Sequence, residues 1–256
     1  RSTAPPATGS RSLKTARPAG AARNSKGTLM DTQRFSRIAN SLKSASISSV
    51  TQTADALRRE GKEVLVFSIG RPDFDTPEHI KAAANDALAK GFVHYTHNRG
   101  ILPMREAVAA YLKRQNGLDY DPKTEIMITA GAQEALMLCT HALLDPGDEV
   151  LVPSPDYPLW TACVNLAGGT AVHYVCDEES EWYPDIDDMR SKITDRTVAI
   201  VLINPNNPTG AMVSKAELQK WVDYANKVGA IILYDAAYEA YISEEDVPHT
   251  IYECEG

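Results

Sequence analysis

Short apolar runs alternate with segments of helical spacing from residue 125 to residue 234, and this alternation restricts the fold more than any other feature. The apolar runs have the length of buried strands, and the segments between them are long enough for helices. A sheet built from such units is mostly parallel and is covered by helices on both faces. The sequence therefore predicts an α/β domain with strands at 125–129, 149–152, 170–175, 198–203 and 230–234 and helices at 133–144, 158–166, 185–192 and 214–228.

Before residue 125 the pattern predicts two further helices and one strand. Residues 47–60 have helical spacing of their apolar side chains, and 64–69 is a short apolar run typical of a strand. A turn-rich loop follows, and Thr76-Pro77-Glu78 opens the next helix with proline at its first position. The helix expected at 214–228 begins with Ser-Lys-Ala-Glu, which is a capping-box sequence.

The first 34 residues differ in composition from the rest of the chain. Residues 1–29 are rich in Ser, Ala, Pro, Gly and Arg and have few large apolar side chains, so we expect them to be disordered. This stretch is Arg- and Ser-rich without acids, and we interpret it as a leader, a plain tail or an organellar transit peptide. The predicted domains are thus an N-terminal tail at 1–34 and an α/β domain at 35–256.

Composition narrows the classes of partner. The 256 residues are 43% hydrophobic and carry a net charge of −8, which argues against nucleic acid as the main partner. No apolar run approaches the roughly 18 residues that span a bilayer. The 4 cysteines and 6 histidines show no metal-ligand spacing, so we expect reduced thiols and no metal centre. We expect a cytoplasmic protein, or an organellar one if residues 1–29 are a transit peptide.

Two loops that follow strands have the composition of a ligand site. In open α/β sheets ligands bind outside the carboxyl ends of the strands. Gly131 stands between a strand and a helix whose first N–H groups form an anion site suited to phosphate, although such a glycine also serves as a plain connector. Tyr157 follows the strand at 149–152 and is suited to stack on a planar ring, or else it covers the core together with Trp160.

Two further loops carry polar groups that a simple connection does not need. The segment NPNNPTG at 204–210 holds two prolines and three asparagines, which fix the backbone and present amides on a rigid support. Asp235 ends an apolar strand, where a carboxylate is costly unless it is paired. We therefore expect Asp235 to face a cation or a protonated heterocycle; the alternative is that it caps a short helix.

In this order the four segments resemble the class I/II aminotransferases of pyridoxal 5′-phosphate (PLP) fold type I. The strongest match is NPNNPTG, followed by a strand and Asp-x-x-Tyr at 235–238, and the resemblance covers roughly residues 35–256. Further matches are the segment GRPDF at 70–74 and Tyr95 with Gly100 and Arg105. Residues 154–194 resemble the alanine aminotransferases of bacteria, and 234–255 resemble the LL-diaminopimelate aminotransferases, so the substrate stays open.

The resemblance implies a role for each matching residue around PLP. The Ala132 backbone N–H and the Gln133 side chain would hold the phosphate, and Tyr157 would stack on the pyridine ring. Asn207 and Tyr238 would bind the 3′-oxygen of the ring.

The remaining matching residues concern the ring nitrogen, the substrate and the partner subunit. Asp235 would pair with the ring nitrogen and keep it protonated, so that the ring acts as an electron sink. Gly70 would lie near the substrate carboxylate, and Tyr95 would reach the phosphate in the neighbouring subunit, which implies a homodimer. The expected reaction moves an amino group between an amino acid and a 2-oxo acid.

The resemblance also shows a departure. Members of the family continue past Asp-x-x-Tyr to a Ser-x-x-Lys segment, whose lysine forms the Schiff base, and to a C-terminal domain. Here the last lysine is Lys227, so no catalytic residue of that kind is in the chain and the C-terminal domain is absent. We therefore expect an inactive, truncated member and assign the aminotransferase activity to its intact parent.

Three other interpretations remain open at this stage. A PLP lyase on the same scaffold would share the cofactor site. A non-catalytic domain that binds PLP or an amino acid is an alternative from a different class. A dinucleotide-binding protein is the weakest alternative, because no G-x-G-x-x-G follows the first strand.

Overall fold

The computed structural model of the chain describes residues 22–23, 29–30, 36–41, 46–68, 70, 72–243 and 247–256. Two units divide the chain, residues 1–43 and residues 44–256. In the first unit the short strands β1 (Ala22–Arg23) and β2 (Leu29–Met30) pair antiparallel, and α1 spans Arg37–Ser41. Most of residues 1–29 lies outside the described residues, so their predicted disorder and the predicted boundary at residue 34 stay predictions.

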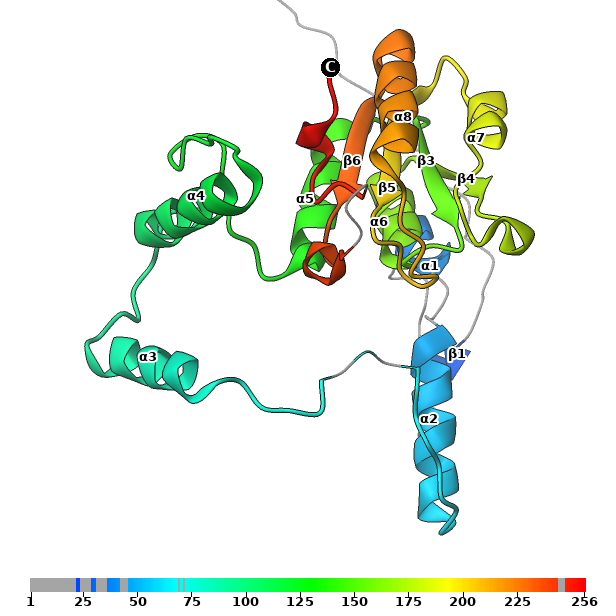
Figure 1. Ribbon diagram of the computed structural model, residues 1–256. Helices are drawn as coiled ribbons and strands as arrows, with labels where there is room; N and C mark the ends of the chain where they lie inside the picture. The colour runs from blue at the N-terminus through cyan, green and yellow to red at the C-terminus, as the bar shows by residue number, and fades with distance from the viewer. Residues whose placement is uncertain are drawn as a thin grey trace, which may run out of the picture. The chain divides into compact units, whose positions relative to one another are not determined.

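A parallel sheet forms the centre of the second unit (Figure 1). Its strands are β3 (Glu149–Ser154), β4 (Thr170–Val175), β5 (Thr197–Ile203) and β6 (Ile231–Asp235), in the spatial order β4-β3-β5-β6. All three pairings are parallel. The predicted α/β fold with a parallel sheet is confirmed. Because the strands are parallel, the loops that follow them leave from the same edge.

Helices cover both faces of this sheet. The helices α5 (Ala132–Leu143) and α6 (Leu159–Ala167) place Leu136 and Val164 in one core with Val150 and Val152 of β3. The side chain of Leu151, between those two valines, points to the opposite core, as the alternation along a strand requires. That second core lies under α7 (Ile186–Lys192) and α8 (Lys215–Val228). Because β3 is buried on both faces, its sequence is a continuous apolar run, and this run was the signal that predicted the strand.

Capping side chains fix where these helices begin. The Ser214 hydroxyl accepts the N–H of Glu217, and the Asp185 carboxylate accepts the N–H groups of Asp187 and Asp188. Each of these caps satisfies a donor that has no partner within the helix. The expected helices therefore begin one residue later than predicted, because Ser214 and Asp185 are caps and not the first helical residues.

The predicted strand at 125–129 is not a strand. The Ile128 N–H donates to the carbonyl of Arg99 at 3.0 Å, and among the described residues no strand lies beside this segment to continue a ladder. A strand is defined by such a ladder, so an apolar run without a neighbour stays an extended segment. The prediction at 64–69 is wrong for the same reason over 64–68, and Ile69 lies outside the described residues.

The part of the second unit that precedes the sheet is helical. The helix α2 spans Ser46–Arg59, close to the predicted bounds, and α3 spans Glu78–Ala89 with Pro77 as its N-cap and not its first residue. The helix α4 (Leu102–Asn116) was not predicted. Within the described residues no helix is both long and apolar enough to cross a membrane.

All four cysteines are free thiols, and two of them lie in the core. Burial raises the pKa of the Cys176 thiol to about 11, and burial also raises the pKa of Cys163. Both therefore stay protonated at neutral pH, which agrees with a packing role.

Candidate functional site

The loop before α5 presents free backbone N–H groups to solvent. Gly131 is the N-cap of this helix, has φ of 78° and contributes no side chain as a cap. The first N–H groups of a helix, here those of Ala132 and Gln133, have no carbonyl partner within the helix. A Cβ built on Gly131 would meet nothing within 4 Å, so space for a ligand is open there. This geometry suits an anion.

The side chains of two loops meet beside this helix start. The Nε2 atom of Gln133 lies 3.3 Å from the hydroxyl of Tyr157, which belongs to the loop between β3 and α6. The helices α5 and α6 pack on the same face of the sheet. The contact therefore joins the loop before α5 to the loop before α6. The structure thus brings together the predicted anion site and the predicted ring platform.

Asp235, the last residue of β6, is held by two donors. Its Oδ2 atom accepts the indole N–H of Trp160 at 3.1 Å, and its Oδ1 atom accepts the backbone N–H of Ala237 at 3.1 Å. The second bond closes the turn after β6, but the short helix that follows, Glu239–Tyr241, has Tyr238 as its N-cap, so the interpretation of Asp235 as a helix cap is wrong. Because Trp160 belongs to α6, the carboxylate points to the face that carries α5 and Gln133.

The loop at 204–210 is fixed by its own amides. The side chain of Asn204 is buried; its Oδ1 accepts the Val213 N–H at 2.8 Å, and its Nδ2 donates to the Tyr234 hydroxyl at 3.0 Å. The Asn206 carboxamide oxygen accepts both the N–H and the hydroxyl of Thr209. These two asparagines therefore build the loop and leave Asn207 to present its side chain.

Asn207 and Tyr238 line one hollow next to Asp235. The hollow has a volume of about 300 Å³ and is also lined by Met212 and Tyr241. Its walls come from the loop after β5 and the segment after β6, and these strands end side by side because Ile203 pairs with Asp235. The two residues predicted to bind the ring oxygen therefore line the same hollow from two neighbouring segments.

Two predicted residues are not brought into this group. Tyr95 is fully exposed, and the space around Gly70 is open where a Cβ would lie. The described contacts of the site include neither residue, so the roles implied for them stay predictions.

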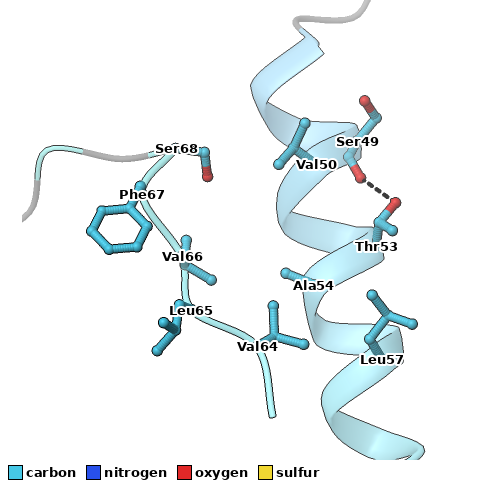
Figure 2. A pocket seen from close by; sticks show the side chains of 10 residues that line it. All are labelled: Ser49, Val50, Thr53, Ala54, Leu57, Val64, Leu65, Val66, Phe67 and Ser68. Carbon is cyan, nitrogen blue, oxygen red and sulfur yellow. Dashed lines mark hydrogen bonds between the residues drawn. The ribbon is translucent and has the colours of Figure 1, made fainter. Parts of the chain in front are cut away.

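A second hollow of about 470 Å³ lies between α2 and the extended segment 64–68 (Figure 2). Val64 and Val66 point toward the helix, whereas Leu65 and Phe67 point away from it. No ionisable side chain lines this hollow, so its lining supplies no acid–base group. Its lining includes none of the predicted site residues.

Sequence reasoning missed two contributions to the site. Trp160 was interpreted only as a residue that covers the core, but its indole N–H also binds Asp235. Asn204 was treated only as part of an unusual loop, although it joins β5 to β6. The available signal for Trp160 was an amphipathic ring at the start of a buried helix, since a buried indole N–H needs an acceptor.

Comparison with known proteins identifies relatives of this arrangement. The family model for aminotransferase class I and II matches residues 62–254. The aromatic-amino-acid aminotransferase 2 of Thermococcus litoralis is 43% identical over 179 residues, which are 70% of this chain and 46% of that protein. The glutamate-pyruvate aminotransferase AlaA of Escherichia coli is 42% identical over 207 residues, which are 79% of this chain and 50% of that protein.

Solved structures agree in fold over most of the chain. The alanine aminotransferase from Pyrococcus furiosus superposes with a TM-score of 0.79 at 41% identity and covers 84% of this chain and 55% of that one. The aspartate aminotransferase of Thermotoga maritima gives a TM-score of 0.81 at 31% identity, with 86% and 58% covered. The chain spans about half the length of the curated relatives it matches. By its sequence and its fold, the chain belongs to the aminotransferase class I and II family.

Proposed function

We propose that this chain is the PLP-binding part of an aminotransferase that moves an amino group between an amino acid and a 2-oxo acid. One observation carries the proposal. The contacts from Gln133 to Tyr157 and from Trp160 to Asp235 support it, because they link the start of α5, an aromatic ring and a carboxylate along one edge and one face of the sheet.

The residues at the anion end fit a phosphate monoester. Three features combine there: the unpartnered N–H groups at the start of α5, open space above Gly131, and the amide of Gln133. The positive end of the helix dipole favours the phosphate charge. The Tyr157 hydroxyl keeps the Gln133 amide in place, and its ring stands where a planar heterocycle would stack.

The residues at the other end fit a protonated pyridine. Each oxygen of Asp235 receives one N–H and retains a second lone-pair direction, so the carboxylate is able to accept a further donor. Asn207 and Tyr238 line the neighbouring hollow and supply donors for an oxygen on the ring. Bound PLP supplies an electron sink whose strength depends on protonation of the ring nitrogen, and Asp235 is the group that would keep the proton on that nitrogen.

The names of the relatives favour transfer of an amino group over elimination. They include aromatic-amino-acid, glutamate-pyruvate and aspartate aminotransferases. We extend to this chain only the reaction class that these names share, with an amino acid and a 2-oxo acid as substrates. We also propose a homodimer in which the exposed side chain of Tyr95 contacts the partner's cofactor phosphate.

The test of this proposal is binding of pyridoxamine 5′-phosphate, which has no aldehyde and so forms no Schiff base with surface lysines. Quenching of tryptophan fluorescence on titration of the full-length protein measures the affinity. We expect saturable binding that inorganic phosphate competes away. Asp235→Asn should weaken it by about tenfold or more, since a hydrogen bond to a charged group contributes about 1.5–3 kcal/mol.

Asp195→Asn is the matched control, because Asp195 is an exposed carboxylate remote from the site. Equal affinity in both variants would contradict the assignment of Asp235. Activity is then tested by transfer of labelled nitrogen from alanine, aspartate, glutamate or phenylalanine to a 2-oxo acid. Release of ammonia without a new amino acid would favour the lyase interpretation.

A further inference from the structure

A single turn reaches both ends of the candidate site. Residues 157–160 form this turn. The backbone N–H of Trp160 closes it by donating to the backbone carbonyl of Tyr157 at 3.0 Å. Pro158, with φ of −58°, is the N-cap of α6. A turn with one proline and a closing hydrogen bond has few alternative conformations. The separation between its two aromatic side chains is therefore set by the backbone.

Each aromatic side chain of the turn makes one polar contact. The Tyr157 hydroxyl meets Gln133 at the anion end, and the indole N–H of Trp160 meets Asp235 at the ring-nitrogen end. Trp160 is 4% exposed and packs in the core beneath α5 and α6, so its ring is held from all sides. The indole N–H of Trp160 thus has a fixed position, and the carboxylate of Asp235 orients toward it.

The bond has two consequences for Asp235. Together with the Ala237 N–H it restrains the plane of the carboxylate, because the two oxygens are held by donors from two different elements. An indole N–H donates a hydrogen bond and never accepts one, so it binds one lone pair of the Asp235 carboxylate and fixes the direction of that oxygen. The free lone-pair directions of Asp235 are left for a ligand.

A purely packing role does not require this contact. The buried Trp221, on the opposite face of the sheet, packs against Tyr174 with ring centroids 5.0 Å apart. Among the hydrogen bonds of the described residues, the bond of Trp160 joins an indole to a carboxylate, and that carboxylate ends the strand next to the candidate site. Trp221 is thus a tryptophan that is also buried and that serves packing.

We propose that Trp160 is a positioning residue that holds the carboxylate of Asp235 oriented toward the ring nitrogen of PLP, and that the turn at 157–160 sets the distance between the phosphate end and the nitrogen end of the site. This inference rests on the proposed function.

The first measurement needs no cofactor. A ¹H–¹⁵N spectrum of the full-length protein contains an indole N–H signal for Trp160, which is assigned by its loss in Trp160→Phe. In Asp235→Ala this signal should move upfield and exchange faster with water, while the signal of Trp221 stays in place. An unmoved Trp160 signal would overturn the positioning role and leave the assignment of the cofactor site standing.

The second measurement is the affinity for pyridoxamine 5′-phosphate. Trp160→Phe keeps an aromatic ring and removes the N–H, and we expect affinity to fall about tenfold, in line with a hydrogen bond to a charged group. Trp221→Phe removes the same atoms from the other core and should leave affinity unchanged. Thermal midpoints of both variants report on folding.

The outcomes separate the two proposals. Equal affinities of Trp160→Phe and Trp221→Phe, with a weaker Asp235→Ala, would overturn the role of Trp160 alone. Absence of binding by the unaltered protein would overturn the proposed function and this inference together. Weaker binding of Trp160→Phe, combined with a shifted indole signal in Asp235→Ala, supports both.

Discussion

The carboxamide of Asn204 lies 3.0 Å from the hydroxyl of Tyr234, and this bond joins the ends of β5 and β6 beneath the candidate site. Asn204 is 1% exposed and also accepts the Val213 N–H. Burial raises the pKa of Tyr234 to about 12, so the hydroxyl keeps its proton. One buried side chain therefore fixes the base of the loop at 204–210 and the end of the strand that carries Asp235.

Replacing Asn204 with Ala should destabilise the fold. The change leaves the Val213 N–H and the Tyr234 hydroxyl without their partner in a buried place, and each such group costs about 1–3 kcal/mol. The free energy of unfolding from urea titration measures the loss. Asn165→Ala is the control, because Asn165 is exposed on α6 and such a change usually stays within about 0.5 kcal/mol. A loss for Asn204 no larger than this would contradict the account.

The ion pair at the start of β3 predicts a dependence of stability on pH. The hydroxyl of Thr194 and the guanidinium of Arg196 donate to Glu149, and these bonds, that of Thr194 first, hold the pKa of Glu149 below its ordinary value of 4.5. Because the pKa of Glu149 is lower in the folded state, the ionised carboxylate stabilises the fold at pH above the ordinary value of 4.5. This stabilisation is lost as the pH falls through the pKa of the folded state.

Glu149→Gln should therefore lower the free energy of unfolding by about 1 kcal/mol or more at neutral pH. The difference from the unaltered protein should shrink as pH falls below 4.5, the ordinary value for this carboxyl. Urea titrations at a series of pH values test this. A difference that stays constant down to the acid limit of folding would show that Glu149 acts by packing alone.

Gly100 has a close neighbour that a side chain would strike. Its φ is 89°, and a Cβ there would lie 2.8 Å from the Cβ of Ile128. The chain therefore has to shift in Gly100→Ala, which we expect to lower the thermal midpoint by several degrees. Gly61 has φ of 78° with open space around it, so Gly61→Ala isolates the cost of the backbone conformation. Similar midpoints for the two variants would contradict the predicted clash.

Asn206 and Asn207 are neighbours with separable roles. Both residues line the hollow with Tyr238, but the side chain of Asn206 is engaged by two hydrogen bonds from Thr209 within the loop. Asn207→Ala should weaken binding of pyridoxamine 5′-phosphate by about 2–10-fold, as loss of one neutral hydrogen bond does, and leave the thermal midpoint unchanged. Asn206→Ala should lower the midpoint. The reverse pattern would refute the division of roles.

The sequence predicted those elements whose signals are local. The bounds of β4 agree with the predicted 170–175, and β5 begins one residue before the predicted 198. The apolar run of β5 reflects burial on both faces, and that signal lies in the strand's own residues. Helix starts were also predicted to within one residue, because capping depends on side chains such as Ser214 and Asp185 that directly precede the helix.

Structural features that depend on residues far away in the sequence could not be predicted from the sequence. The segment 125–129 has the composition of a strand, but strand structure requires a neighbour that no local pattern names. In α4 the buried Arg105 donates to the carbonyls of Gly100 and Pro122. A charged residue therefore occupies a buried position of the helix, and the periodic pattern of apolar residues that would predict a helix is interrupted. The contact of Trp160 with Asp235 joins residues 75 positions apart. Its existence follows only from the folded sheet.

A crystal structure of the full-length protein with pyridoxamine 5′-phosphate tests the central claim most directly. The account predicts phosphate oxygens within hydrogen-bond distance of the N–H groups of Ala132 and Gln133. The ring nitrogen should lie within about 3 Å of an oxygen of Asp235, with the ring against Tyr157 and its oxygen facing Asn207 and Tyr238. A ligand whose phosphate lies elsewhere, or whose ring nitrogen faces away from Asp235, would contradict the claim that this sheet edge is the PLP site.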